Sequence, residues 1–151
     1  MNLVAVGLTK HIRVVKRMSD EHVLICVLGE SSCGKDTLVN QICKTSNLTQ
    51  LISYTTRPQR KNEGATHIFV DEDIYNSMKE NNEIAAYTNI NNNRYWSTIE
   101  QLYDSDFYII DPIGVDSLKN LNLPNLRIVT VYINVPEDVR KERAIKRGDD
   151  V

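Results

Sequence analysis

The sequence is poor in several residue types, and each shortage excludes a class of protein. Six glycines and four prolines among 151 residues leave no low-complexity linker. Three cysteines without metal-ligand spacing indicate reduced thiols in a cytoplasmic protein. No apolar run approaches the roughly 20 residues needed to cross a bilayer, so we expect no membrane association. The basic residues near the N-terminus follow the short apolar run, the reverse of a secretory signal.

Neither sign of charge is in excess. The chain carries 18 Lys and Arg against 20 Asp and Glu, a net charge of -2, so nothing global indicates a nucleic-acid partner. An apolar content of 41% and a charged content of 25% are typical of one soluble globular domain. We interpret residues 1–20 as an N-terminal extension before a domain at 21–151. Its basic cluster is either a solvated face or an arm that touches phosphate or RNA.

From Val23 onward, apolar runs alternate with helical patterns. Strands are predicted at 23–28, 106–111 and 126–135, a hairpin at 83–98, and helices at 34–45, 71–82 and 136–148. The first helix pairs Leu38 with Ile42 and Val39 with Cys43 at a spacing of four, which predicts one buried stripe. Continuous apolar strands separated by helices predict an α/β fold with a parallel sheet flanked by helices.

The stretch "GESSCGKDTL" has the spacing of a phosphate-binding loop. Gly29, Gly34 and Lys35 form the pattern Gly-x-x-x-x-Gly-Lys between a predicted buried strand and a helix. In that setting backbone amides and the helix N-terminus surround phosphate, and the lysine reaches the outer phosphates. A plain strand–turn–helix connection is the alternative. The predicted ATP-binding residues are Gly29, Glu30, Ser31, Ser32, Cys33, Gly34, Lys35, Asp36 and Thr37.

Asp36 occupies the position that normally carries a hydroxyl for Mg²⁺. A carboxylate there is repelled by triphosphate unless a metal lies between them or the side chain points away. Thr37 supplies a hydroxyl one position later and is our candidate metal-binding residue. Cys33 lies among the loop amides, where thiolate is favoured. We interpret it as a tolerated loop residue whose alkylation would block nucleotide.

The segments "SYTTRPQR", "NNE" with "NRYWST", and "DPIGVDSLK" carry a second signal. Together with the phosphate loop, they resemble guanylate kinases over about residues 23–148. The resemblance implies a P-loop NTPase-type sheet with a small inserted monophosphate-binding lobe at about 53–98. It also implies the start of a lid at about 143–151.

The loop after Tyr54 contains two arginines three apart, Arg57 and Arg60, stiffened by Pro58. Two guanidinium groups there suit a dianionic phosphate, although an ordinary surface pair is the alternative. The resemblance implies a full set of monophosphate-binding residues: Ser53, Arg57, Arg60, His67, Tyr95, Ser97 and Asp111. It likewise implies the catalytic cations, which are Lys35, Arg57, Arg143 and Arg147.

The sequence departs from the family pattern in several places. Ala86 falls where guanylate kinases carry a glutamate that reads guanine, and His67 replaces a phosphate-binding tyrosine. Trp96 replaces a glycine, and Asp36 replaces the hydroxyl beside Lys35. The sequence stops at "GDDV", where the family's lid begins. We therefore expect this chain to bind nucleotide better than it turns it over.

These residues predict an ATP- and Mg²⁺-dependent kinase that phosphorylates a (deoxy)nucleoside monophosphate. By the resemblance, the acceptor would be GMP or dGMP. The protein would be a monomer or a homodimer. A catalytically weak binding module for a protein or phosphopeptide is the alternative. Such modules lose the loop lysine, whereas Lys35 is present here. A third reading, a phosphate-loop enzyme of another kind, does not explain the two arginines after Tyr54.

Overall fold

The computed structural model describes residues 21–60 and 66–148. The predicted N-terminal extension and the last three residues of the predicted lid lie outside the described residues. The elements in chain order are β1 (His22–Leu28), α2 (Lys35–Thr45), β2 (Tyr54–Thr55), β3 (Ile68–Phe69), α3 (Glu72–Glu80), β4 (Ile84–Ile90), β5 (Asn93–Thr98), α4 (Ile99–Asp104), β6 (Phe107–Ile109), α5 (Pro112–Asn120), β7 (Leu126–Tyr132) and α6 (Glu137–Arg147).

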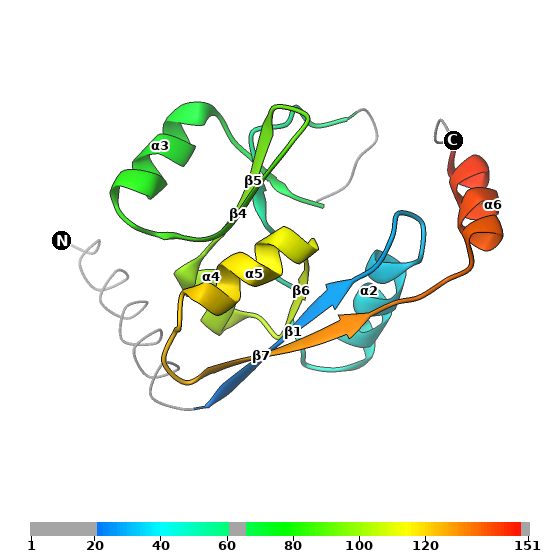
Figure 1. The fold of residues 1–151 in the computed structure, drawn as a ribbon, viewed down its shortest axis with the longest axis horizontal. Coiled ribbons are helices and arrows are strands. Elements are labelled where there is room, and N and C mark those ends of the chain that lie inside the picture. The colour runs from blue at the N-terminus through cyan, green and yellow to red at the C-terminus, as the bar shows by residue number, and fades with distance from the viewer. Residues whose placement is uncertain (1–20, 61–65, 149–151) are drawn as a thin grey trace.

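The first layer of the fold is a parallel sheet of three strands in the order β6-β1-β7. β1 pairs with β6 from Ile25 opposite Phe107 and with β7 from His22 opposite Leu126. Figure 1 shows β1 and β7 side by side, with α6 extending beyond the end of β7. The parallel sheet that was predicted from the apolar runs is therefore confirmed.

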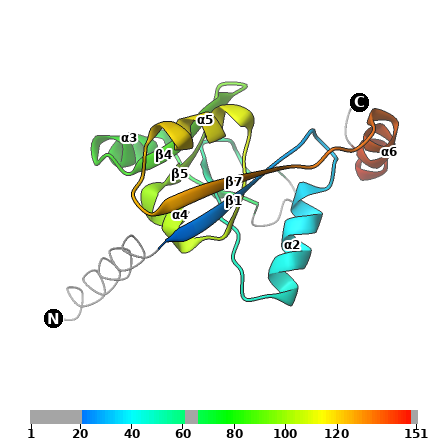
Figure 2. The same ribbon diagram turned by 60° about the horizontal axis from the view of Figure 1, so that its bottom comes forward.

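Helices cover both faces of β1 because its side chains alternate between the faces. Leu24, Cys26 and Leu28 pack into one core, and Val27 packs into another. The first core takes Leu102 of α4 with Val115 and Leu118 of α5, and the second takes Val39 of α2. In Figure 2, α2 and α5 accordingly lie on opposite sides of the β1–β7 layer.

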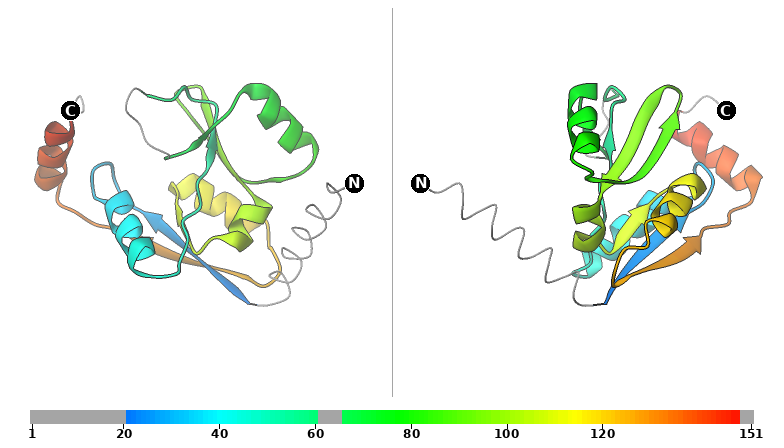
Figure 3. Two further views of the ribbon diagram at one scale, coloured as in Figure 1. Left: turned by 180° about the vertical axis from the view of Figure 1, so that it is seen from behind. Right: turned by 60° about the vertical axis from the view of Figure 1, so that its left-hand side comes forward.

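The inserted lobe has its own sheet, in the order β3-β2-β5-β4, with α3 packed beside it. Seen from behind in Figure 3, this lobe stands above α4 and α5, with α2 lower and to the left. The β4–β5 hairpin turns at Asn91 and Asn92, whose φ angles are 50° and 62°. Two consecutive left-handed residues match the twist of a hairpin, and asparagine tolerates that conformation. The predicted asparagine turn is confirmed.

Trp96, which stands where the family pattern has glycine, is the centre of the lobe's core. Its side chain is fully buried and stacks on Tyr54 with ring centroids 5.5 Å apart. Tyr75 of α3 meets the indole edge-on at 5.0 Å, and the indole N–H donates to the Met78 sulfur at 3.3 Å. The large side chain is accommodated because α3 supplies an aromatic and a thioether partner.

Two expectations from the sequence are wrong. β7 is not a buried strand: its described neighbour is β1 alone, and Val131 and Tyr132 are 41% and 55% exposed. The α2 stripe is also narrower than predicted. Val39 is buried, but Leu38 is 47% exposed because it faces a cavity beside the loop.

Two helices, α4 and α5, were not predicted; α4 has six residues, whereas α5 has nine, as many as the predicted α3. Their start signals are nevertheless present in the sequence. Thr98 and Gln101 form a reciprocal capping box at α4. Asp111 caps α5, followed by Pro112 in the first turn. In the described ranges no helix is both long and apolar enough to cross a membrane.

The cysteines are free thiols, as predicted. Cys26 lies in the core of the sheet, and burial raises the pKa of its thiol to about 11, with Lys119 opposing the shift. Cys43 of α2 is half-buried and packs against the second core. Cys33 is buried within the phosphate loop.

Replacing Trp96 by alanine should remove the centre of the lobe's core. We expect Trp96→Ala to lower the free energy of unfolding by about 3–5 kcal/mol, since a large buried aromatic leaves a cavity. Tyr132→Ala, which truncates an aromatic that is 55% exposed, should cost about 0.5 kcal/mol or less. Urea denaturation followed by circular dichroism measures both. Equal losses in the two variants would contradict this account of the lobe.

Candidate active site

The phosphate loop joins β1 to α2 through tightly packed backbone. Gly29 has a φ of +151°, and a β-carbon there would lie 2.7 Å from both the Cys33 sulfur and the Ile133 carbonyl oxygen. Gly34 caps α2 with a φ of 97°, and Ser32 also adopts a left-handed conformation, with a φ of 60°. The loop therefore takes a shape that only glycine permits at its first residue.

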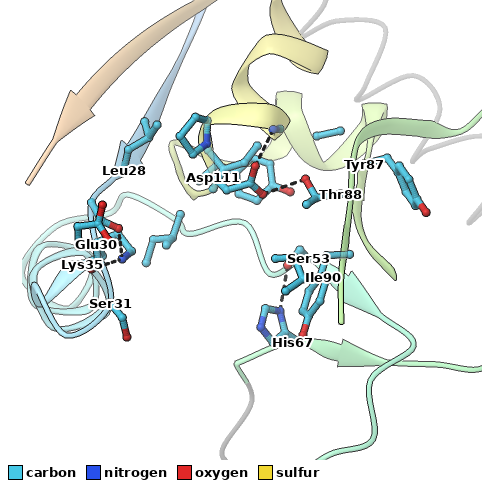
Figure 4. Close-up of a pocket in the computed structure, with 18 of the residues that line it drawn as sticks. Leu28, Glu30, Ser31, Lys35, Ser53, His67, Tyr87, Thr88, Ile90 and Asp111 are labelled. Atoms are coloured by element: carbon cyan, nitrogen blue, oxygen red, sulfur yellow. Dashed lines mark hydrogen bonds between the residues drawn. The ribbon is translucent and has the colours of Figure 1, made fainter. Parts of the chain in front are cut away.

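The Lys35 side chain arches back over this loop. Its ammonium donates to the Gly29 carbonyl at 2.7 Å and to the Glu30 carbonyl at 3.0 Å, as Figure 4 shows. The Cys33 sulfur lies 3.8 Å from the same nitrogen. Lys35 thus holds a positive charge above the N-terminal end of α2, where the helix dipole is also positive.

A cavity of about 470 Å³, here called the inter-lobe cavity, opens between the loop and the inserted lobe. The loop side contributes Gly29, Glu30, Ser31 and Lys35. The remaining lining residues are Leu28, Ser53, His67, Ala86, Tyr87, Thr88, Ile90, Tyr95, Tyr108, Ile109, Ile110, Asp111, Pro112, Gly114 and Tyr132.

Ser53, His67 and Tyr95 form one end of the inter-lobe cavity. The Ser53 hydroxyl and the His67 Nδ1 are 3.0 Å apart, and the His67 ring packs edge-on against Tyr95 at 5.5 Å. Figure 4 shows this pair across the cavity from Lys35. The structure therefore brings three of the predicted monophosphate-binding residues together.

Arg57 and Arg60 are not among the residues that line this cavity. The Arg57 guanidinium lies 5.3 Å over the Phe69 ring and donates to the Pro58 carbonyl at 3.0 Å. Arg60 is exposed on the same loop. Both arginines lie on the loop that follows β2, outside the lining of the inter-lobe cavity.

Asp111 lies at the opposite end, with both carboxylate oxygens engaged. One accepts from the Gly114 amide at 2.9 Å as the N-cap of α5, and the other accepts from the Thr88 hydroxyl at 2.9 Å. The carboxylate therefore links the parallel-sheet layer to β4 of the inserted lobe.

Ser97 is fully buried behind the cavity wall rather than on it. Its hydroxyl is hydrogen-bonded to Tyr108 and lies 3.4 Å from the Ala86 amide. Burial raises the pKa of Tyr108 above its ordinary range, and the Ser97 hydrogen bond opposes that shift. Tyr108, not Ser97, presents its side chain to the cavity.

A second cavity, the loop–helix cavity, measures about 720 Å³ and lies between the phosphate loop and α6. It is lined by Ser32, Cys33, Gly34, Lys35, Asp36, Thr37, Leu38, Gln41, Arg143 and Arg147. Arg143 donates to the Cys33 carbonyl at 3.1 Å, and Arg147 donates to the Ser32 hydroxyl at 3.1 Å. The predicted lid arginines thus already contact the loop, and Lys35 lines both cavities.

Comparison with known proteins agrees with this geometry. The guanylate kinase family model matches residues 21–151. The chain belongs to the guanylate kinase family. The crystal structure of guanylate kinase from Anaplasma phagocytophilum superposes with a TM-score of 0.63 at 25% identity, over 84% of this chain and 69% of that one.

Sequence relatives named guanylate kinase differ in how much of their length the chain spans. The Malacoplasma penetrans protein is 37% identical over 84 residues, which are 53% of this chain and 43% of the relative. The Anaplasma phagocytophilum protein is 28% identical over 85% of this chain and 66% of its own length. The Mycoplasmoides gallisepticum protein is 29% identical over 91% and 75%. The aligned part of the chain therefore covers from 43% to 75% of the length of these three relatives.

Ala86 stands on the wall of the inter-lobe cavity where the family pattern has glutamate. Its side chain is 2% exposed and belongs to a core cluster with Tyr108 and Ile110. Among the described lining residues the carboxylates are Glu30 and Asp111. The Asp111 carboxylate already accepts hydrogen bonds from the Gly114 amide of α5 and the Thr88 hydroxyl.

Thr88 and Tyr108 are site residues that the sequence did not single out. Thr88 could have been found from its place on β4 beside Ala86, because four residues of this strand, Ala86, Tyr87, Thr88 and Ile90, line the cavity. No local pattern marks Tyr108, since its place on the wall depends on packing against another strand, where Ser97 of β5 is hydrogen-bonded to it.

Removing the Asp111 carboxylate should cost more than an ordinary helix cap. We expect Asp111→Ala to lower the free energy of unfolding by about 2–3 kcal/mol, because α5 loses its cap and the buried Thr88 hydroxyl loses its acceptor. Asp71→Ala removes only the cap of α3, where Asp71 accepts from the Ile74 amide at 3.0 Å, and should cost about 1 kcal/mol. Chemical denaturation compares them. Equal costs would show that the Thr88 bond adds nothing.

Proposed function

We propose that the protein is a nucleoside monophosphate kinase that transfers the γ-phosphoryl group of ATP to a nucleoside monophosphate. The observation that carries this proposal is the place of Lys35, which lines both cavities. A cation at the junction of two cavities suits a phosphoryl group passing from a donor in one to an acceptor in the other.

ATP phosphates would bind in the loop–helix cavity, against the loop at residues 29–37 and the N-terminus of α2. Phosphate oxygens carry more negative charge than the two carbonyls that Lys35 contacts, so they would replace those carbonyls as its acceptors. Arg143 and Arg147 reach the same cavity from α6. Their positions support the prediction that they act on the donor phosphates.

The transfer requires positioning and charge neutralisation rather than a protein nucleophile. An oxygen of the acceptor phosphate would form a bond to the γ-phosphorus while the bond from that phosphorus to the bridging oxygen breaks. The products are ADP and a nucleoside diphosphate. Lys35, Arg57, Arg143 and Arg147 would supply positive charge to the equatorial oxygens.

The loop–helix cavity offers hard oxygen donors that fit Mg²⁺. The Asp36 carboxylate and the Thr37 hydroxyl are both exposed there, and Mg²⁺ commonly combines one or two protein oxygens with substrate phosphates. No set of three or more His, Cys, Asp or Glu residues within the described ranges could hold a metal by itself. Thr37 would hold the ion, which would neutralise charge on the outer phosphates.

The monophosphate would occupy the inter-lobe cavity with its phosphate at Ser53, His67 and Tyr95. Arg57 and Arg60 would move from their present places toward that phosphate when it binds. Asp111 and the Ser97–Tyr108 pair would border the sugar and base. Kinship with guanylate kinases favours GMP or dGMP, but Ala86 offers no acceptor for the guanine edge, so base discrimination would be weak. The presence of Lys35 counts against the alternative of a pure binding module.

Lys35→Ala should weaken ATP binding with little effect on the fold. Loss of a charged hydrogen-bond donor should cost about 1.5–3 kcal/mol of binding free energy, roughly 10- to 150-fold in affinity. Lys44→Ala, which removes an exposed lysine from the last turn of the same helix, is the matched control. Isothermal titration with ATP and Mg²⁺ gives both affinities. Equal affinity in the two variants would overturn the assignment of the loop.

Ala86→Glu should raise the preference for guanine over other bases. A carboxylate at this wall would accept from guanine donors and should add about 1–3 kcal/mol of discrimination. Ala86→Met adds similar bulk without an acceptor and should not change the preference. A coupled assay of ADP release against a panel of monophosphates tests both. Strict GMP specificity in the unmodified protein would show that another residue reads the base.

A further inference from the structure

Asp36 lies in the loop–helix cavity, where its negative charge would act on a bound triphosphate. It follows Lys35 in the first turn of α2, is exposed, and lines the loop–helix cavity beside Thr37. Within the part of the chain that the structure describes, it makes no ion pair. The two arginines of that cavity instead donate to the loop, at the Cys33 carbonyl and the Ser32 hydroxyl.

The charges of the loop itself do not favour a bare triphosphate. Residues 29–37 contain one cation, Lys35, and two anions, Glu30 and Asp36. A free nucleoside triphosphate adds several negative charges within a few ångströms of the Asp36 carboxylate. A divalent cation between the two would reverse this repulsion, because carboxylate and phosphate oxygens are both ligands that Mg²⁺ prefers.

The motif position supports a direct bond to the metal. In the phosphate-loop pattern, the residue after the lysine is the one whose side-chain oxygen reaches Mg²⁺. A carboxylate at that position carries its oxygens one bond farther from the backbone than a serine hydroxyl, and it has a full negative charge. It would therefore bind the ion more strongly than the usual hydroxyl while repelling phosphate when the ion is absent.

We propose that the Asp36 carboxylate is a direct ligand of the divalent cation carried by the nucleoside triphosphate. The loop accordingly accepts the cation–nucleotide complex and rejects the free nucleotide. This inference rests on the proposed function, because it places the donor triphosphate in the loop–helix cavity. Thr37 would then hold the same ion alongside Asp36.

The test compares the unmodified chain with Asp36→Ser, which restores the usual hydroxyl, by isothermal titration with ATP. Each protein is titrated once with excess Mg²⁺ and once with excess EDTA. With Mg²⁺ we expect Asp36→Ser to bind ATP about 10-fold more weakly, since a charged ligand of the ion is lost. With EDTA we expect it to bind about 10-fold more tightly, since the repulsion is lost. Asp36→Asn, which keeps an oxygen without charge, should lie between the two proteins in both conditions.

The control is Asp73→Ser. Asp73 is also an exposed acid in the first turn of a helix, α3, directly after that helix's first residue. Its loss matches the effect of Asp36→Ser on a helix dipole but should leave both ATP affinities unchanged. A thermal melt of each variant confirms that the proteins titrated are folded.

The direction in which Asp36→Ser changes the ATP affinity, with Mg²⁺ and with EDTA, decides whether Asp36 is a ligand of the cation. Opposite signs with Mg²⁺ and with EDTA support ligation by Asp36. Tighter binding by Asp36→Ser in both conditions would overturn it, since the carboxylate would then only repel. Equal affinities in both conditions would also overturn it and leave the proposed kinase intact. If the unmodified chain binds ATP in neither condition, the proposed function itself fails.

Discussion

Between the end of β1 and the phosphate loop, the backbone at Gly29 passes so close to Cys33 and Ile133 that a β-carbon does not fit. This contact presses the loop directly against the segment that leaves β7. Because that segment continues into α6, it also sets where Arg143 and Arg147 lie relative to the loop. One close approach of backbone to backbone thus positions the helix N-terminus and the arginines of the loop–helix cavity together.

The inter-lobe cavity depends on a different connection, between the sheet layer and the inserted lobe. Asp111 begins α5 on the sheet side, and its second oxygen holds Thr88 of β4. The inter-lobe cavity therefore has a floor made of both layers.

Much of this arrangement could be predicted from the sequence because its signals are local. The glycine spacing before Lys35, the continuous apolar run of β1 and the paired asparagines of the hairpin each specify a backbone conformation. Other features depend on packing between distant segments. The exposure of β7 depends on which neighbours it has, and the seclusion of Ser97 depends on Tyr108 from another strand. Neither is encoded within a single stretch of sequence.

The departures from the family pattern divide between the two ends of the site. On the wall of the inter-lobe cavity, Ala86 replaces a charged residue with apolar packing, and Trp96 replaces a small residue within the core of the lobe. Elsewhere in the two cavities, His67 adds an imidazole beside Ser53 and Asp36 adds a carboxylate beside Thr37. An apolar base pocket discriminates mainly by shape, which rejects a similar base only weakly. Most of the binding free energy would then come from phosphates and cation, which all nucleotides share. Selection among ligands would accordingly depend more on phosphate number and metal charge than on the base.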